Sequence, residues 1–152
     1  MARMKNLFEA ATVDEVIVRL DSLTPASMAL WGKMNVAQAV AHCIPSIEMA
    51  LGVRKAKRSF IGRLIGPVFK GQWLSEKPIN KNAPTDPTFL RTGEHDLNME
   101  REQLEVLIRR FYAAGAAGCT TTPHSFFGPM TPGEWARLMY KHLDHHLQQF
   151  GA

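Results

Sequence analysis

The sequence lacks the features that mark several large classes of protein. It contains only two cysteines, and no apolar run approaches the ~18 residues that a membrane-spanning helix needs. Residues 1–10 hold no apolar core of the kind found in secretory signals. A glycine-rich phosphate loop, a nucleophile elbow and a Cys-x-x-Cys pair are all missing, so nothing supports a nucleotide hydrolase, a serine hydrolase or a zinc finger.

The composition is that of an ordinary folded protein. Hydrophobic residues make up 45% of the 152 residues and charged residues 21%. This length fits one domain over residues 1–152, and such a chain can bury about 70% of its unfolded surface without a disulfide or structural metal. Because it needs no disulfide, Cys43 and Cys119 favour a reducing compartment, and we expect a cytoplasmic protein.

Basic residues are concentrated in one part of the chain. The net charge of +4 is too small and too general to predict nucleic-acid binding by itself. No acid occurs between Glu48 and Glu76, however, where six basic residues lie: Arg54, Lys55, Lys57, Arg58, Arg63 and Lys70. Two interpretations stay open. Segment 54–70 is a solvated helix face with its loop, or it is the working surface of a non-catalytic helical binding domain for an anionic partner or membrane.

The periodic signals in the sequence are helical, and no segment is convincing as a strand. Apolar residues at helical spacing predict helices near 12–21, 36–53, 98–112 and 132–150, with a minor amphipathic helix over 59–70. Capping pairs predict three of the starts: Thr12 with Glu15, Asn35 with Gln38, and Thr131 with Glu134.

One long stretch of the sequence has no helical or strand periodicity. Residues 75–95 are rich in proline and polar residues, which predicts a long connection able to cover a functional site. We therefore expect an all-α fold, namely a four-helix bundle with a minor extra helix and one long connection.

Two of the six histidines share a face of the last predicted helix. At about 100° per residue, His142 and His146 fall on the apolar stripe that holds Trp135 and Met139, so both are expected to face the core. Imidazoles four residues apart can converge on one metal ion. The alternative is a pair of core histidines bonded to carbonyls and to each other, since an unpaired buried ring nitrogen costs about 1–3 kcal/mol.

The leading candidate for a third ligand is His42, in the middle of the most apolar predicted helix. Gln38, His42 and Ser46 form the only polar line on this helix, which is either its thin solvent-facing edge or a stripe lining an internal site. The most apolar face is rotated about 100° or more from His42. That rotation opposes a metal site unless the helix is buried on two sides.

The other candidate chemical groups are weaker. His95 and His124 lie in predicted loops, and His145 is either an outer-shell acid or base or a solvated surface residue. Cys43 cannot pair with His42 as nucleophile and base, because adjacent helical residues point about 100° apart.

Two segments resemble a known superfamily. The run WGKMNVAQ at 31–38, continuing to His42, and the runs MTPGEW at 130–135 and KHLDHH at 141–146 resemble an uncharacterised branch of the DinB/YfiT-like superfamily. The resemblance covers nearly the whole chain. Many members follow the last histidine with Arg-Gly-Gln, whereas residues 147–149 here are Leu-Gln-Gln, so only the glutamine matches.

The resemblance implies both a site and a type of reaction. Members of the superfamily are four-helix bundles in which three histidines hold a divalent metal, which here would be zinc, nickel or iron on His42, His142 and His146. The characterised enzymes use the metal to activate a low-molecular-weight thiol. The implied function is therefore a metal-dependent thiol transferase or hydrolase that acts on a small electrophile, with a homodimer as an open question.

Overall fold

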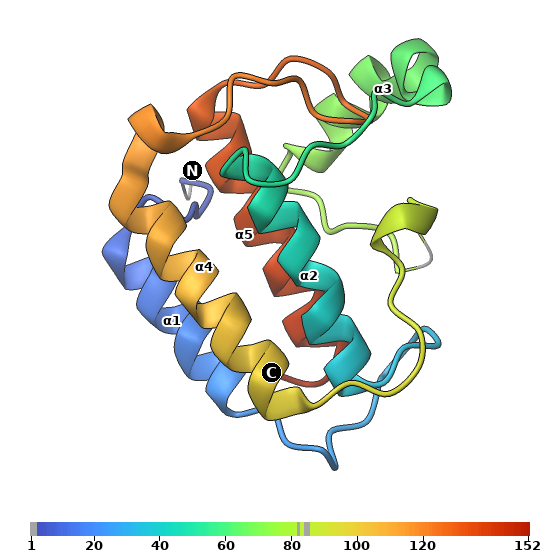
Figure 1. Cartoon of the computed structure of the whole chain (residues 1–152), viewed down its shortest axis with the longest axis vertical. Helices are drawn as coiled ribbons and strands as arrows, with labels where there is room; N and C mark the ends of the chain where they lie inside the picture. Colours follow the sequence, from blue (N-terminus) through green and yellow to red (C-terminus); the bar gives the residue numbers. More distant parts are fainter. Residues whose placement is uncertain (1–2, 82, 84–85) are drawn as a thin grey trace.

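The protein is all-helical over the residues that its computed structural model describes, which are 3–81, 83 and 86–152. The elements, labelled in Figure 1, are α1 (Ala10–Asp21), α2 (Val36–Ala50), α3 (Phe60–Trp73), the 3-10 turn η1 (Pro87–Phe89), α4 (Leu97–Gly118) and α5 (Pro132–Gln149). The described residues contain no strand, so the predicted all-α class is confirmed.

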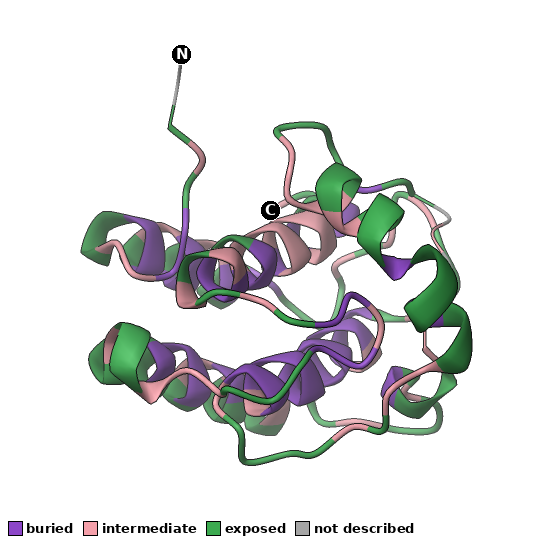
Figure 2. Ribbon diagram, turned by 90° about the horizontal axis from the view of Figure 1, so that it is seen from above, coloured by how far each residue is buried: buried purple, intermediate pink, exposed green. Residues whose placement is uncertain are grey.

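Helices α1, α2, α4 and α5 pack around a shared core, and α3 lies outside them (Figure 1). Helix α2 contacts both α4 and α5, and α1 lies against the same two helices. The buried faces of these helices turn toward one another in Figure 2. The largest fully buried side chains, among them Trp135 of α5, Phe111 of α4 and Ile47 of α2, come from different helices, so burial of apolar surface holds the elements together.

Helix α2 is buried on nearly all sides. Its buried residues include polar ones, and His42 is only 3% exposed. The interpretation of the polar line on α2 as a solvent-facing edge is therefore wrong. The line meets the 75–95 connection instead: Gln38 Nε2 donates to the Gly93 carbonyl at 2.9 Å.

Two of the three predicted helix starts are confirmed in atomic detail. Asn35 and Gln38 form a reciprocal capping box at α2, and Thr131 and Glu134 form another at α5. The predicted start at Thr12 is wrong, because α1 begins at Ala10 and the Thr12 side chain is buried. A tertiary contact fixes the earlier start, since the Leu7 N–H donates to the Ala136 carbonyl at 3.2 Å.

The ends of three elements also differ from the predicted ranges. Helix α2 ends at Ala50 rather than near residue 53, whereas α3 continues beyond residue 70 to Trp73. The predicted helix 98–112 continues to Gly118, although its backbone leaves helical geometry at Gly115, which has φ 62°. Glycine accepts this left-handed conformation, so the Ala-Gly run interrupts the helix rather than ending it.

No described helix has both the length and the apolar character that crossing a bilayer requires, in agreement with the sequence prediction.

Candidate metal site

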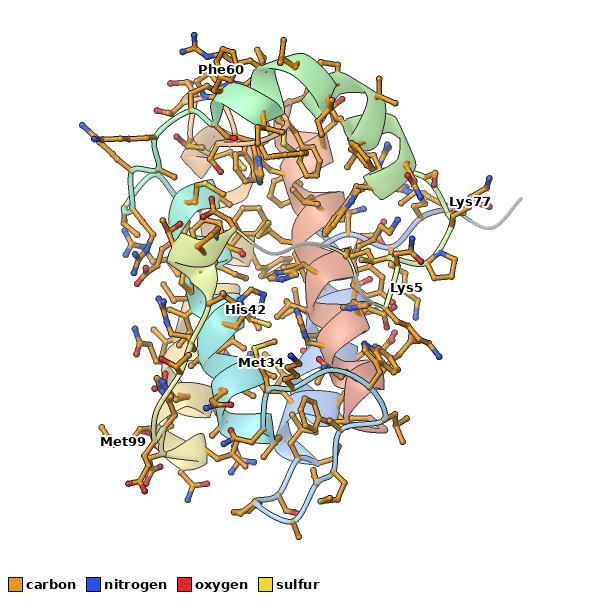
Figure 3. All side chains as sticks on the ribbon, turned by 90° about the vertical axis from the view of Figure 1, so that its right-hand side faces the viewer. Lys5, Met34, His42, Phe60, Lys77 and Met99 are labelled. Atoms are coloured by element: carbon orange, nitrogen blue, oxygen red, sulfur yellow. The ribbon has the colours of Figure 1, made fainter. Side chains whose placement is uncertain are left out.

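Three histidines that are distant in sequence converge between α2 and α5. One ligand atom each from His42, His142 and His146 lies within 4.8 Å of the others. The Nε2 atoms of His42 and His142 are 3.1 Å apart, although 100 residues separate them in the chain. Figure 3 shows His42 on the side of α2 that faces α5. The structure thus brings together the three side chains named from the sequence.

One pair of the cluster has the spacing of two ligands on a single transition metal ion. With a metal–nitrogen bond of about 2.0–2.1 Å, two tetrahedral ligand nitrogens are about 3.3 Å apart. The separation of 3.1 Å between the Nε2 atoms of His42 and His142 is close to this value, and the ligand atom of His146 lies within 4.8 Å of both. The ring centroids of the three pairs are 4.8–5.0 Å apart and the rings are inclined by 77–83°, so the histidines surround one point rather than stack.

A backbone carbonyl fixes the tautomer of His42. Its Nδ1 lies 2.7 Å from the carbonyl oxygen of Phe89. A carbonyl can only accept a hydrogen bond, so Nδ1 carries the proton and donates it. Nε2 consequently carries a lone pair, which faces His142 Nε2 at 3.1 Å. Metal-ligating histidines commonly use this arrangement, in which the second ring nitrogen donates to a carbonyl.

A glutamine fixes the tautomer of His146 in the same way. Gln149 Nε2 donates to the Trp31 carbonyl at 2.7 Å, which leaves Gln149 Oε1 as the acceptor 2.8 Å from His146 Nδ1. His146 therefore donates from Nδ1 and keeps the lone pair of Nε2. Gly32 makes room for this amide, because a Cβ atom there would lie 2.6 Å from Gln149 Nε2.

Burial keeps all three imidazoles neutral at neutral pH. Desolvation lowers the pKa of His42 and lowers the pKa of His146 to about 3. The pKa of His142 lies well below its usual value, first because of burial and then because of the neighbouring histidines. Neutral imidazole is the form that can act as a metal ligand.

The 75–95 connection is anchored on both sides of the cluster. Lys141, the residue before His142, donates to the carbonyls of Ser75 and Lys77 at 2.7 Å each. The later part of the connection is held on α2 by Gln38 and His42 through Gly93 and Phe89. The described part of the connection therefore runs from α5 to α2 beside the three histidines. Residues 82, 84 and 85 of the predicted connection lie outside the described residues.

An aromatic and a basic side chain lie next to the cluster. The His145 ring is 5.0 Å from His146 and 5.5 Å from the Trp31 ring, and Lys81 Nζ lies 4.8 Å from the centre of that indole. His145 is half-buried, and desolvation lowers its pKa. Its exposure is thus intermediate between the two positions considered for it, an outer-shell group and a solvated surface residue.

The two remaining histidines stabilise loops, as the sequence suggested. His124 Nδ1 accepts from the N–H groups of Phe126 and Phe127 at 3.0 and 3.1 Å, and burial lowers its pKa to about 4. His95 lies within hydrogen-bond distance of the Glu100 carboxylate and the Thr92 carbonyl. Neither belongs to the three-histidine cluster.

The cysteine nearest to the site is chemically inert. Cys43 is buried in the core and has no disulfide partner, and burial raises the pKa of its thiol to about 12. A thiolate at this position is therefore absent at neutral pH, which agrees with the sequence argument against a Cys–His nucleophile.

Sequence reasoning missed the partners of the histidines. Phe89 and Trp31 act through main-chain carbonyls, which no side-chain pattern reveals. Gln149 had a visible signal, since it is the one residue after the last histidine that matches the DinB/YfiT-like pattern. In the structure Gln149 bonds both His146 Nδ1 and the Trp31 carbonyl.

Comparison with known proteins gives one match. A family model described as "Protein of unknown function (DUF1569)" matches residues 1–152. No curated protein and no solved structure matches the chain. Since the family description names no reaction, the function has to be argued from the site.

Proposed function

The chain belongs to the DUF1569 family, and we propose that it binds one divalent transition metal ion through His42, His142 and His146. We further propose that α1, α2, α4 and α5 form a four-helix bundle of the DinB/YfiT-like type. The ion is zinc, nickel or iron, because neutral imidazoles suit all three.

One observation carries the proposal, namely the direction of the ring lone pairs. The Nδ1 protons of His42 and His146 are committed to acceptors outside the cluster, so the Nε2 atoms of both rings carry lone pairs, and that of His42 faces His142 Nε2 at 3.1 Å. The alternative of a histidine pair bonded to carbonyls and to each other shares these partners, but it does not call for a third imidazole in the same cluster, which His146 supplies. Free, converging lone pairs in a site that disfavours protonation are the arrangement that a cation requires.

The residues around the cluster suit a reaction of a small molecule. A bound ion of this kind acts as a Lewis acid and lowers the pKa of a coordinated water or thiol. His42 and His146 are oriented by hydrogen bonds to the Phe89 carbonyl and to Gln149. His145, half-buried beside His146, is positioned to exchange a proton with a substrate at the rim.

From these features we propose a metal-dependent thiol transferase or hydrolase that acts on a small electrophile, with a low-molecular-weight thiol as the second substrate of the transferase. The proposal includes a cytoplasmic location, for which the free thiols of Cys43 and Cys119 are the support. The apolar surroundings of Cys43 make an ion-activated external thiol a better nucleophile than any thiol of the core.

The decisive experiment measures metal content without a polyhistidine tag. Untagged protein is purified, stripped with a chelator, and titrated separately with zinc, nickel and ferrous ions by calorimetry. We expect one ion per chain for the wild type. His42→Ala and His142→Ala should each weaken binding more than about 100-fold, beyond the effect of losing an outer-shell partner.

His95→Ala is the matched control, because His95 is also hydrogen-bonded on both ring nitrogens but lies outside the cluster. It should bind metal as the wild type does. If the wild-type protein takes up no stoichiometric metal, or if His142→Ala leaves the uptake unchanged, the proposal is wrong.

A further inference from the structure

Helix α3 exposes a large apolar face to solvent. Phe60, Leu64 and Val68 follow one another at intervals of four residues, so they lie on one side of the helix. Five large apolar residues on this side are exposed: Phe60 by 76%, Ile61 by 61%, Leu64 by 68%, Ile65 by 40% and Val68 by 77%. Contiguous exposed apolar patches of this kind mark interaction sites in folded proteins.

The orientation of α3 is fixed by glycines on its opposite side. A Cβ atom at Gly62 or Gly66 would lie 2.6 or 2.2 Å from the Phe126 carbonyl oxygen, so the helix backbone rests directly on that loop. Trp73 packs on Phe127 with ring centroids 5.6 Å apart. Because only glycine permits this close approach, the contact sets which side of the helix faces the loop and leaves the apolar side outward.

The position of α3 leaves this apolar side unobstructed. The helix lies at the periphery of the molecule, outside the four packed helices (Figure 1), and is mostly exposed in Figure 2. It has 14 residues, which corresponds to a length of about 21 Å. A flat surface could therefore approach the exposed face along its length.

The charge around α3 indicates which kind of partner surface suits this apolar side. No acidic residue occurs between Glu48 and Glu76. Lys55, Lys57 and Arg63 are exposed and have no ion-pair partner within the described part of the chain. Other cations of the segment are already neutralised, since Arg54 pairs with Glu48 at 2.7 Å and Lys70 pairs with Glu134 at 2.9 Å.

We propose that α3 docks on the surface of an anionic lipid bilayer. Phe60, Ile61, Leu64, Ile65 and Val68 enter the headgroup boundary, while Lys55, Lys57 and Arg63 contact the acidic headgroups; we call this set the α3 face. Amphipathic helices with aliphatic and aromatic residues beside cations bind such interfaces while lying in the membrane plane. Two copies of the chain paired through this face would bring like charges together, which disfavours a dimer here.

Vesicle co-sedimentation of the intact chain tests the docking. The probes are vesicles of phosphatidylcholine alone and vesicles with about one-third phosphatidylglycerol. We expect binding only to the acidic vesicles, and weaker binding as salt rises from about 0.05 M to about 0.5 M, where the Debye length falls below about 5 Å. The variant Ile61→Ser/Leu64→Ser/Val68→Ser should lose at least about 90% of the bound fraction, and Lys57→Gln/Arg63→Gln at least half.

The matched control is Val106→Ser/Arg110→Gln, which removes an exposed apolar residue and an exposed cation from α4. It should bind like the wild type, and circular dichroism should show all variants folded. Absence of wild-type binding to the acidic vesicles, or equal binding of the triple-serine variant, would overturn the proposal. A dimer in sedimentation velocity that the triple-serine change dissociates would also overturn it, because the α3 face would then be an interface between copies.

Discussion

The Nδ1 atom of His42 lies 2.7 Å from the carbonyl oxygen of Phe89, which joins the centre of α2 to the turn η1. The same imidazole presents Nε2 to His142 at 3.1 Å. One ring therefore connects the proposed metal to the 75–95 connection. Any change that moves the Phe89 carbonyl should change metal affinity, because the orientation of the ring depends on it.

Asp86→Ala tests this dependence on the connection. The Asp86 carboxylate accepts from the N–H and the hydroxyl of Thr88 at 2.9 and 2.8 Å, and so caps η1. Without the cap the Phe89 carbonyl loses its fixed position, and we expect zinc affinity to fall about tenfold. Competition with a chromophoric chelator measures the change. Ser59→Ala removes a similar cap from α3 and should leave zinc affinity unaltered; equal losses in both variants would refute the link.

Gln149→Leu tests how His146 is held. The leucine removes the acceptor for the Nδ1 proton, and we expect metal affinity to fall about 10- to 100-fold. Gln149→Glu keeps an acceptor at the same place and should retain more of the affinity than the leucine variant. Gln148→Leu is the exposed neighbouring control. Isothermal titration of folded protein gives the values, and a leucine variant that binds as tightly as the glutamate variant would contradict the assigned role.

The stability of the metal-free protein should fall in mild acid, in part because of His124. Burial lowers the pKa of His124 to about 4, whereas the ordinary value is 6.5. Between these values the unfolded chain binds a proton that the native chain does not, so the free energy of unfolding decreases as the pH falls. The His124 share of the decrease is about 2 kcal/mol between about pH 7 and pH 5.

His124→Asn isolates that contribution. An asparagine side chain can still accept from the N–H groups of Phe126 and Phe127 but does not titrate. Urea unfolding with a chelator present should therefore show a smaller loss of stability for the variant between these pH values. The variant keeps some dependence, because the pKa values of His42 and His146 are lowered in the same direction. Identical losses in the two proteins would show that His124 is not kept neutral by folding.

A pair of glycine substitutions tests the docking of α3 on its loop. At Gly66 an added Cβ would meet the Phe126 carbonyl oxygen at 2.2 Å, whereas at Gly71 nothing lies within 4 Å. Gly66→Ala should push the helix from the loop and speed hydrogen exchange of the α3 amides about tenfold or more. Gly71→Ala should slow it or leave it unchanged, since alanine favours the helix by up to about 1 kcal/mol. Equal exchange in both variants would mean that α3 does not rest on Gly66.

Local sequence patterns located helix starts correctly where the capping hydrogen bonds are all made within a few residues. The capping boxes at Asn35 and Thr131 satisfy backbone N–H groups within a few residues, so the sequence alone locates those helix starts. Thr12 has the same local pattern but is buried, because the Leu7 hydrogen bond to Ala136 sets where the chain enters α1. A tertiary contact of this kind leaves no local signature.

The candidate site was likewise predictable only where local geometry determines it. The spacing of His142 and His146 on one face follows from helix geometry, and both lie in the cluster. For His42 the periodicity was misleading, since the face away from the apolar maximum is also covered, in this case by the 75–95 connection. The carbonyl partners could not be predicted, because every residue has a carbonyl and only the folded chain selects one.

The three proposed ligands do not become available together as the chain folds. His142 and His146 lie on one helix and can chelate an ion as soon as α5 forms, whereas His42 joins them only after a contact across 100 residues. Metal added during refolding would therefore be captured first by a weak two-ligand site on a nascent helix. The slower packing of α2 against α5 would then add His42 and complete the site. The rate at which high-affinity metal binding appears therefore reports on the late assembly of these two helices.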